Sequence, residues 1–229
     1  MNKIQDIKVA VDAVVFGYEK DSLSILLIKR GVEPFKNSWA LPGGLVLDNE
    51  SLEDAVVREL QEETGVEINY LEQLYTYGKP GRDPRNRVVS VSYVGLVSPS
   101  QFKLEAATDA YEAKWFDVKD LPDLAFDHQD ILEKGLSRVR TKIKYQPIGF
   151  ELLNSHFPFS DLEHLYQTIL DKKIDRRNFR KKILSFGILK ETDKIHQEGS
   201  GRPAKLFTFN STKYKELEEK GFHFEIKLA

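Results

Sequence analysis

Clustered carboxylates between residues 50 and 63 are the most chemically specific feature of the sequence. Glu59, Glu62 and Glu63 follow the spacing i, i+3, i+4, which puts their carboxylates on one face of a helix. Like charges held this close repel one another unless a cation lies among them. Hard oxygen ligands suit Mg²⁺ or Mn²⁺, and these ions suit a substrate with phosphates. The alternative is an acidic helix face that contacts only solvent.

The residues around these carboxylates predict a capped helix that follows a glycine turn. Apolar residues recur at helical spacing from Leu52 to Leu60, so this face is expected to pack on a core. Ser51 with Asp54 predicts a capping box at the start, and Gly65 predicts the end. The preceding Gly43-Gly44 pair has no Cβ and lets the backbone approach a ligand or a metal closely. This context disfavours a helix face that is only solvated.

Segment 44–66 resembles the Nudix box, G-x5-E-x7-R-E-U-x-E-E-x-G-U, at every fixed position. The matching residues are Gly44, Glu50, Arg58, Glu59, Leu60, Glu62, Glu63, Gly65 and Val66. The resemblance implies a Nudix fold and chemistry on a nucleoside diphosphate linked to another moiety.

The resemblance also implies roles for the residues of the box. Arg58 is expected to orient a glutamate, and Glu50 is expected to serve as an accessory acid. The expected catalytic residues are Glu50, Arg58, Glu59, Glu62 and Glu63. The expected metal site, with Glu59 and Glu63 as the main ligands of Mg²⁺ or Mn²⁺, comprises Gly44, Glu59, Glu62 and Glu63. The general base stays open between Glu50, Glu62 and a downstream acid, for which Glu105, Asp109 and Glu112 are candidates.

Composition limits the class of protein. The chain has 229 residues and no cysteine, which excludes disulfides, thiol catalysis and zinc sites with Cys ligands. It contains no apolar stretch of membrane-spanning length, and its first residues lack the apolar region of a signal peptide. We therefore expect a cytoplasmic protein without a membrane partner.

The pattern predicts an α+β chain of two domains, 1–147 and 148–229. In the first, strands near residues 9–16, 23–28, 71–77, 88–97 and 113–116 surround the acidic helix and a second helix over 126–144. With the resemblance, this indicates a Nudix α/β/α sandwich with a mixed sheet. The first domain has 19 Lys and Arg against 24 Asp and Glu, and the second has 15 against 12. The two domains are therefore expected to bind different partners.

The loop at residues 78–87 joins two predicted strands and is rich in turn residues and basic side chains. Arg82, Arg85 and Arg87 are candidates to bind the diphosphate of an effector through charge-assisted hydrogen bonds. A solvated loop explains them nearly as well. His128, at the start of the second helix, is interpreted as a capping or packing residue in preference to a general base.

A strongly basic helix dominates the second domain. Residues 172–182 include seven Lys or Arg and one Asp. A capping box at Ser160–Glu163 predicts a first helix, Asp175 caps the basic one, and a hairpin follows, which is the order of a winged helix-turn-helix. Such a domain reads DNA with its second helix, and the predicted contacts are Arg176, Arg177, Asn178, Arg180, Lys181, Arg202 and Lys205. The alternative is a solvated basic helix on a dimerisation or lid domain.

The two halves together resemble the NrtR family of Nudix-related transcription regulators. The resemblance rests on segments 126–128, 175–183 and 201–207 besides the box. It implies a homodimer that binds double-stranded operator DNA and responds to ADP-ribose, whereas some relatives respond to sugars such as arabinose. Many members have a degenerate box and sense without cutting, but the box of this chain is complete.

Two functions follow. One is a DNA-binding regulator whose Nudix domain senses ADP-ribose or a related NAD or sugar metabolite, with hydrolysis left open. The other is a Mg²⁺-dependent pyrophosphatase of ADP-ribose or another nucleoside diphosphate sugar, with an accessory C-terminal domain.

Overall fold

The computed structural model describes residues 6–19, 21–68, 70–104, 110–196 and 203–226. These residues form two compact units, which divide between Arg138 and Val139, and the turn at residues 21–22 groups with the second unit. The division falls inside helix α2 (His128–Lys142). The domain boundary expected between residues 147 and 148 stays a prediction.

One mixed sheet forms the first unit. Its seven strands, among the described residues, are β1 (Lys8–Glu19), β2 (Ser22–Arg30), β3 (Trp39–Ala40), β4 (Gly43–Leu45), β5 (Tyr70–Tyr77), β6 (Val88–Val97) and β7 (Ala110–Asp117). The order is β3-β2-β1-β6-β5, with β4 paired to β1 and β7 paired to β2. Strands β1 and β6 are parallel, from Lys8 opposite Val88 to Gly17 opposite Val97. Strand β1 is central and almost wholly buried, which explains its long apolar run.

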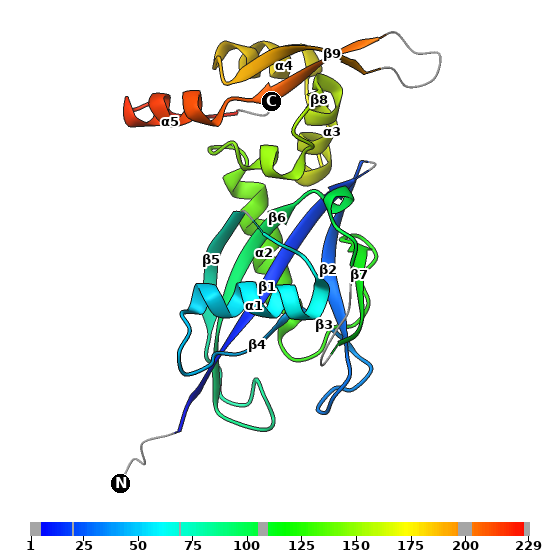
Figure 1. Ribbon diagram of the computed structural model, residues 1–229, viewed down its shortest axis with the longest axis vertical. Coiled ribbons are helices and arrows are strands. Elements are labelled where there is room, and N and C mark those ends of the chain that lie inside the picture. The colour runs from blue at the N-terminus through cyan, green and yellow to red at the C-terminus, as the bar shows by residue number, and fades with distance from the viewer. Residues whose placement is uncertain (1–5, 20, 69, 105–109, 197–202, 227–229) are drawn as a thin grey trace. The chain divides into compact units, whose positions relative to one another are not determined.

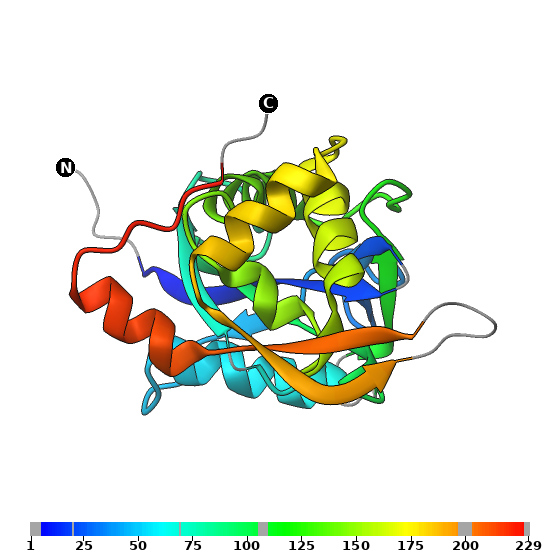
Figure 2. The same cartoon turned by 90° about the horizontal axis from the view of Figure 1, so that it is seen from above.

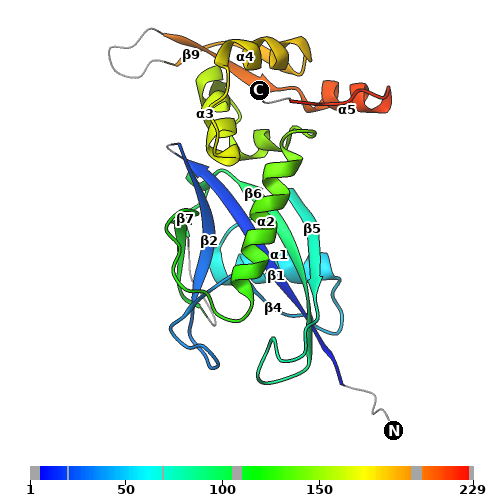
Figure 3. The same cartoon turned by 180° about the vertical axis from the view of Figure 1, so that it is seen from behind.

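Two helices cover opposite faces of this sheet (Figures 1 and 3). Alternate residues of β1, such as Val11 and Val15, pack with Val56 and Leu60 of α1 (Leu52–Thr64). On the other face α2 approaches β1 closely, because a Cβ at Gly135 would lie 2.8 Å from a methyl group of Val14. The sandwich predicted from the sequence is confirmed.

The caps predicted for the acidic helix are also confirmed. Ser51 and Asp54 exchange the two hydrogen bonds of a capping box, and Gly65 ends α1 in the left-handed conformation with φ of 71°. This local geometry fixes where the carboxylates of the helix begin and end.

The second unit has the predicted order of a winged helix (Figure 2). Its elements are η2 (Ile148–Leu152), β8 (Phe157–Pro158), α3 (Phe159–Leu170), α4 (Arg176–Ser185), β9 (Leu189–His196), β10 (Ala204–Phe209) and α5 (Ser211–Glu219). Strand β10 pairs with β9 and β8 in an antiparallel sheet. Its core is aromatic: Phe150 stacks on Phe209 at 4.3 Å between ring centroids, and Phe179 packs against Tyr166 at 4.9 Å. None of the helices in the described part of the chain is long and apolar enough to cross a membrane.

The capping box predicted at Ser160–Glu163 is wrong. Pro158 occupies the N-cap position of α3, so Ser160 lies inside the first turn. Glu163 instead points to α4, as described below. Strand β8 and helix α5 were not predicted. Strand β8 is only two residues long, and α5 packs no residue into the core, so its sequence needs no periodic apolar face.

Candidate functional site

Arg58 draws three acidic side chains of the box together. Its Nε and Nη2 donate to the two oxygens of Glu50 at 2.8 and 2.7 Å. Its Nη1 donates to Glu59 at 2.9 Å and, more weakly, to Glu62 at 3.3 Å. The guanidinium therefore compensates the charge repulsion that the sequence pattern implied.

This arrangement gives the carboxylates of Glu50 and Glu59 different chemistry. Hydrogen bonds from Arg58 and from the backbone N–H of Leu47 lower the pKa of Glu50 to about 2. Glu50 is therefore a poor proton acceptor at neutral pH, and its geometry is that of a positioning residue. Burial raises the pKa of Glu59, and the charge of Arg58 offsets part of that rise. A cation beside Glu59 would stabilise its ionised form.

The glycine turn of β4 brings the backbone against these acids. The N–H of Gly43 donates to Glu63 at 2.8 Å, and Glu63 is buried. A Cβ at Gly44 would lie only 2.2 Å from Oε1 of Glu59, so a larger residue there would displace this carboxylate. Gly43 has φ of 150°, and a Cβ there would lie 2.2 Å from the carbonyl oxygen of Val11. Gly44 is therefore required for the close approach of β4 to α1, and Gly43 for its close approach to β1.

The donor set suits a hard divalent cation in its chemistry. Carboxylate oxygens of Glu59, Glu62 and Glu63 are the ligands that Mg²⁺ and Mn²⁺ prefer. In the part of the chain that the structure describes, however, no three acidic or histidine side chains are arranged to hold a metal ion. Glu59 and Glu62 face Arg58 instead. Metal binding would therefore require these two side chains to turn away from the guanidinium.

A cavity of about 70 Å³ lies between the glycine turn and the loop that joins β5 to β6. Gly43 and Gly44 line one side of it, and Arg82 and Arg85 line the other. The structure thus brings two of the three predicted effector contacts to the start of the Nudix box. Arg87 is not among the lining residues, and its Nη1 donates to the carbonyl of Val88 at 3.2 Å.

Arg82 belongs to a buried network that the sequence did not reveal. Its guanidinium donates to both oxygens of Asp127, at 2.6 and 2.9 Å, and to Asp12 at 3.1 Å. Ser90 donates to the same oxygen of Asp12 at 2.5 Å. The side chain of Arg82 is only 6% exposed. It therefore holds the β5–β6 loop to β1 and to the start of α2, in addition to lining the cavity.

His128 completes this network as a neutral residue. Its Nδ1 accepts a hydrogen bond from the N–H of Leu41 at 2.9 Å, which leaves the proton on Nε2, 3.4 Å from Asp12. Burial lowers the pKa of His128, against the opposing influence of Asp12. The residue is buried, as expected for packing in preference to proton transfer with solvent.

Arg85 is better placed than Arg82 to bind an anion. It pairs with Asp83 at 2.8 Å, yet 48% of its side chain is exposed. Asp83 itself is buried, so the pair holds the loop while nearly half of the Arg85 side chain stays accessible. Arg85 is therefore more accessible to an incoming anion than Arg82 is.

The candidate acids outside the box are less informative. Glu112 is an exposed residue of β7, opposite Lys29 of β2. Glu105 and Asp109 lie outside the described residues.

Two of the predicted DNA contacts on the basic helix α4 bind carboxylates of the same unit. Arg176 donates from Nε and Nη2 to the buried carboxylate of Glu163 on α3, each at 2.8 Å. Asn178 donates its side-chain amide to Asp175, which caps the helix. Both residues therefore have structural roles within the unit.

The remaining predicted DNA contacts differ in what their side chains touch. Arg177 and Lys181 are exposed on α4. The guanidinium of Arg180 lies over the ring of Phe159, 4.3 Å from its centroid. Lys205 of β10 pairs with Glu191 of β9. Arg202 lies outside the described residues.

Sequence reasoning missed Asp12, Asp127 and Glu163. Asp12 interrupts the apolar run of β1, and a charge in a central strand is a usable signal of a buried pair. The partners themselves are far apart in sequence, so no local spacing indicates them.

Comparison with known proteins follows this division of the chain. Residues 6–135 match the family model of the NUDIX domain, and residues 149–209 match that of the NrtR DNA-binding winged helix domain. The chain is 33% identical over 203 residues to the ADPR responsive transcriptional repressor NtrR of Acinetobacter baylyi, covering 87% of this chain and 80% of the relative. The chain belongs to the NrtR family.

Other members and relatives of the family extend this match. The structure of Shewanella oneidensis NrtR complexed with a 27mer DNA matches with a TM-score of 0.82 at 32% identity, covering 96% of this chain and 99% of that one. The NUDIX domain of the same NrtR complexed with ADP ribose matches with a TM-score of 0.56 at 37% identity, covering 59% and 90%. The ADP-ribose pyrophosphatase of Methanocaldococcus jannaschii is 47% identical over 125 residues, which are 55% of this chain and 70% of the relative.

We predict that Arg82→Ala destabilises the first unit far more than Arg85→Ala does. Loss of Arg82 leaves buried Asp12 and half-buried Asp127 without their cation, which costs roughly 3–5 kcal/mol of the free energy of unfolding. Loss of Arg85 costs less, because its half-exposed side chain compensates one buried carboxylate, that of Asp83, instead of two acids. Urea denaturation of the two variants measures the difference, and equal losses would show that the buried network does not hold the loop.

We also predict a pH-dependent contribution from His128. Because its folded pKa is lowered, the unfolded chain binds the extra proton first, so stability falls as pH drops below about 6.5. His128→Gln keeps an acceptor for Leu41 and removes the titrating group. The stability advantage of the wild type over this variant should shrink between pH 7.5 and 5.5, by up to about 1.4 kcal/mol per pH unit. The exposed His223→Gln is the control, and a pH-independent advantage would contradict the assignment.

Proposed function

We propose that this chain is a DNA-binding transcriptional regulator whose Nudix unit senses ADP-ribose or a closely related metabolite. The observation that supports this most is the outward-facing basic surface of α4 in a winged helix that follows a Nudix unit. The Acinetobacter relative is named as a repressor that responds to ADPR, and the Shewanella relative was crystallised with DNA and, as its Nudix domain, with ADP ribose.

Helix α4 would enter the major groove, as the second helix of this motif does. Its exposed Arg177 lies in the first turn, where a guanidinium reaches the edge of guanine. Lys181 and Lys205 suit phosphate contacts, which supply affinity without sequence preference. Arg176 would orient α4 through Glu163 and leave readout to its neighbour. A palindromic operator would pair with a two-fold homodimer of the chain.

The effector would bind at the cavity beside Gly43 and Gly44. Arg85 offers a guanidinium for the diphosphate of ADP-ribose, and the glycines allow the backbone to approach it. A volume of about 70 Å³ is far below the roughly 300–1,000 Å³ of ordinary ligand sites. The β5–β6 loop held by Arg82 would therefore move outward when the effector binds.

Fluorescence anisotropy with promoter DNA from its own operon tests the proposal. We expect specific binding that weakens steeply with salt, because each phosphate contact releases counterions. Addition of ADP-ribose in EDTA should change the affinity for DNA. Absence of specific binding at moderate salt, with and without ADP-ribose, would reject a regulatory function.

We predict that Arg177→Ala and Arg176→Ala fail in different ways. Arg177→Ala should lower operator affinity by about tenfold or more, because a base contact is worth roughly 1–3 kcal/mol, with no change in thermal midpoint. Arg176→Ala should lower the thermal midpoint, since buried Glu163 loses its partner. Lys215→Ala removes an exposed charge on α5 as the control. If Arg177→Ala behaves like this control, Arg177 does not read DNA.

Hydrolysis of ADP-ribose is the second candidate function. The complete box and the 47% identity to an ADP-ribose pyrophosphatase favour it. Mg²⁺ or Mn²⁺ held by Glu59, Glu62, Glu63 and the backbone of Gly44 would supply charge neutralisation for the diphosphate. Arg58 would orient Glu59 and Glu50. Since Glu50 has a low pKa and Glu62 is taken as a metal ligand, an acid outside the box would serve as the base.

We predict that Glu63→Gln lowers Mg²⁺-dependent turnover of ADP-ribose by about 100-fold, because the carboxylate is an expected metal ligand. The fold should survive, since the amide oxygen can still accept from the N–H of Gly43. Release of AMP measured by chromatography, with exposed Glu67→Gln as the control, decides the matter. Equal turnover by both variants would remove Glu63 from the site, and no turnover by the wild type would leave a sensor that does not cut.

A further inference from the structure

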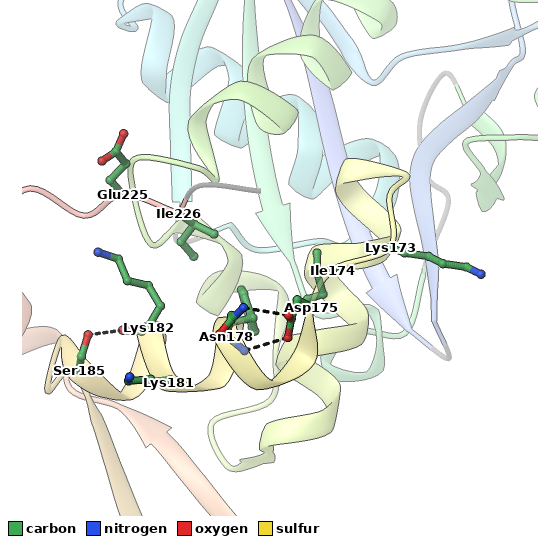
Figure 4. Close-up of a pocket in the computed structure, with 10 residues that line it drawn as sticks. Lys173, Ile174, Asp175, Asn178, Lys181, Lys182, Ser185, Glu225 and Ile226 are labelled. Carbon is green, nitrogen blue, oxygen red and sulfur yellow. Dashed lines mark hydrogen bonds between the residues drawn. The ribbon is translucent and has the colours of Figure 1, made fainter. Parts of the chain in front are cut away.

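A larger cavity lies beside α4, wholly within the second unit, with a volume of about 520 Å³ (Figure 4). Lys173 and Ile174 of the α3–α4 turn form one end, and α4 forms one wall. Glu225 and Ile226 of the C-terminal segment form the opposite wall. This second wall lies beyond residues 149–209, the part that matches the winged helix family model.

The C-terminal wall is packed firmly into the unit. Phe224 is 3% exposed, and its ring lies 4.9 Å from that of Phe186 at the end of α4. The N–H of Ile226 donates to the carbonyl of Lys144 at 2.8 Å. With Phe179 and Ile174, Ile226 gives the cavity an apolar floor.

The opening of the cavity is cationic. Asn178, Lys181, Lys182 and Ser185 follow the spacing i, i+3, i+4, i+7 and so share one face of α4. The side chain of Lys173, on the turn, extends away from the other lining residues (Figure 4). Of the two acids in the lining, Asp175 already accepts from the backbone and side-chain amides of Asn178 as the helix cap, and Glu225 lies on the far wall.

The geometry points to a binding site for a small organic anion of mononucleotide size, with one phosphate or carboxylate group and a flat apolar part. The volume lies within the range of small-molecule sites, and an apolar floor ringed by a few polar groups is their usual composition. Lysine ammonium groups bind phosphate as point charges. Duplex DNA is a less suitable occupant. It is a rigid cylinder that can contact exposed lysines at the surface, but it cannot fill a cavity with an apolar floor.

Lys181 belongs both to this cavity and to the proposed DNA surface. An anion bound here would neutralise positive charge on α4 and weaken DNA binding independently of the Nudix unit. This consequence rests on the proposed function, whereas the binding itself does not.

Methyl NMR of the full chain, with AMP and inorganic pyrophosphate as probes in EDTA, tests the site. The δ1 methyl signals of Ile174 and Ile226, assigned with Ile→Val variants, should shift saturably with AMP. The signal of Ile25, buried in β2, should stay unchanged. Lys181→Ala with Lys182→Ala should weaken AMP binding at least tenfold, and Lys215→Ala with Lys220→Ala should not.

Three results would overturn the proposal. These are no shift at Ile174 and Ile226, equal AMP affinity in the two double variants, and shifts caused by operator DNA but not by AMP. A chain that binds no DNA at all would end the proposed regulatory function, while the methyl signals would still decide whether the cavity binds an anion.

Discussion

Compensation of crowded carboxylates by arginine is the constraint on which the first unit depends. Arg58 binds three acids of the box at the surface, and Arg82 binds Asp12 and Asp127 in the interior. Without these cations the acids would repel one another and resist burial. The Arg82 cluster lines the cavity that the Gly43-Gly44 turn borders, and Gly44 packs against Glu59 of the Arg58 cluster. The same charges that hold the fold therefore shape the site.

The sequence predicted the features whose partners are close along the chain. The carboxylates of α1, its capping box and its glycine end all follow from spacings of a few residues. The Arg82 network joins β1, the β5–β6 loop and the start of α2, so only the folded sheet brings its members together. The residue types at Ser160 and Glu163 match a capping box. In the structure, however, Pro158 is the N-cap of α3, and Glu163 accepts a hydrogen bond from Arg176.

In the second unit, contacts with other side chains likewise give the basic residues of α4 different roles. Arg176, Arg177, Arg180 and Lys181 are all exposed, but Arg176 also pairs with a buried acid and Arg180 also lies over an aromatic ring. A run of cations in sequence is thus divided into residues that build the helix surface and residues that can meet a ligand. An effector that acts on DNA binding needs only a different affinity for the free and DNA-bound chain.

Calorimetric titration of ADP-ribose, in EDTA, into the free chain and into the operator-bound chain tests the central claim most directly. Because coupling between two binding sites is reciprocal, ADP-ribose must change operator affinity by the same factor by which operator changes ADP-ribose affinity. The account predicts that the two titrations give different affinities. Equal affinities for the free and operator-bound chain would contradict it.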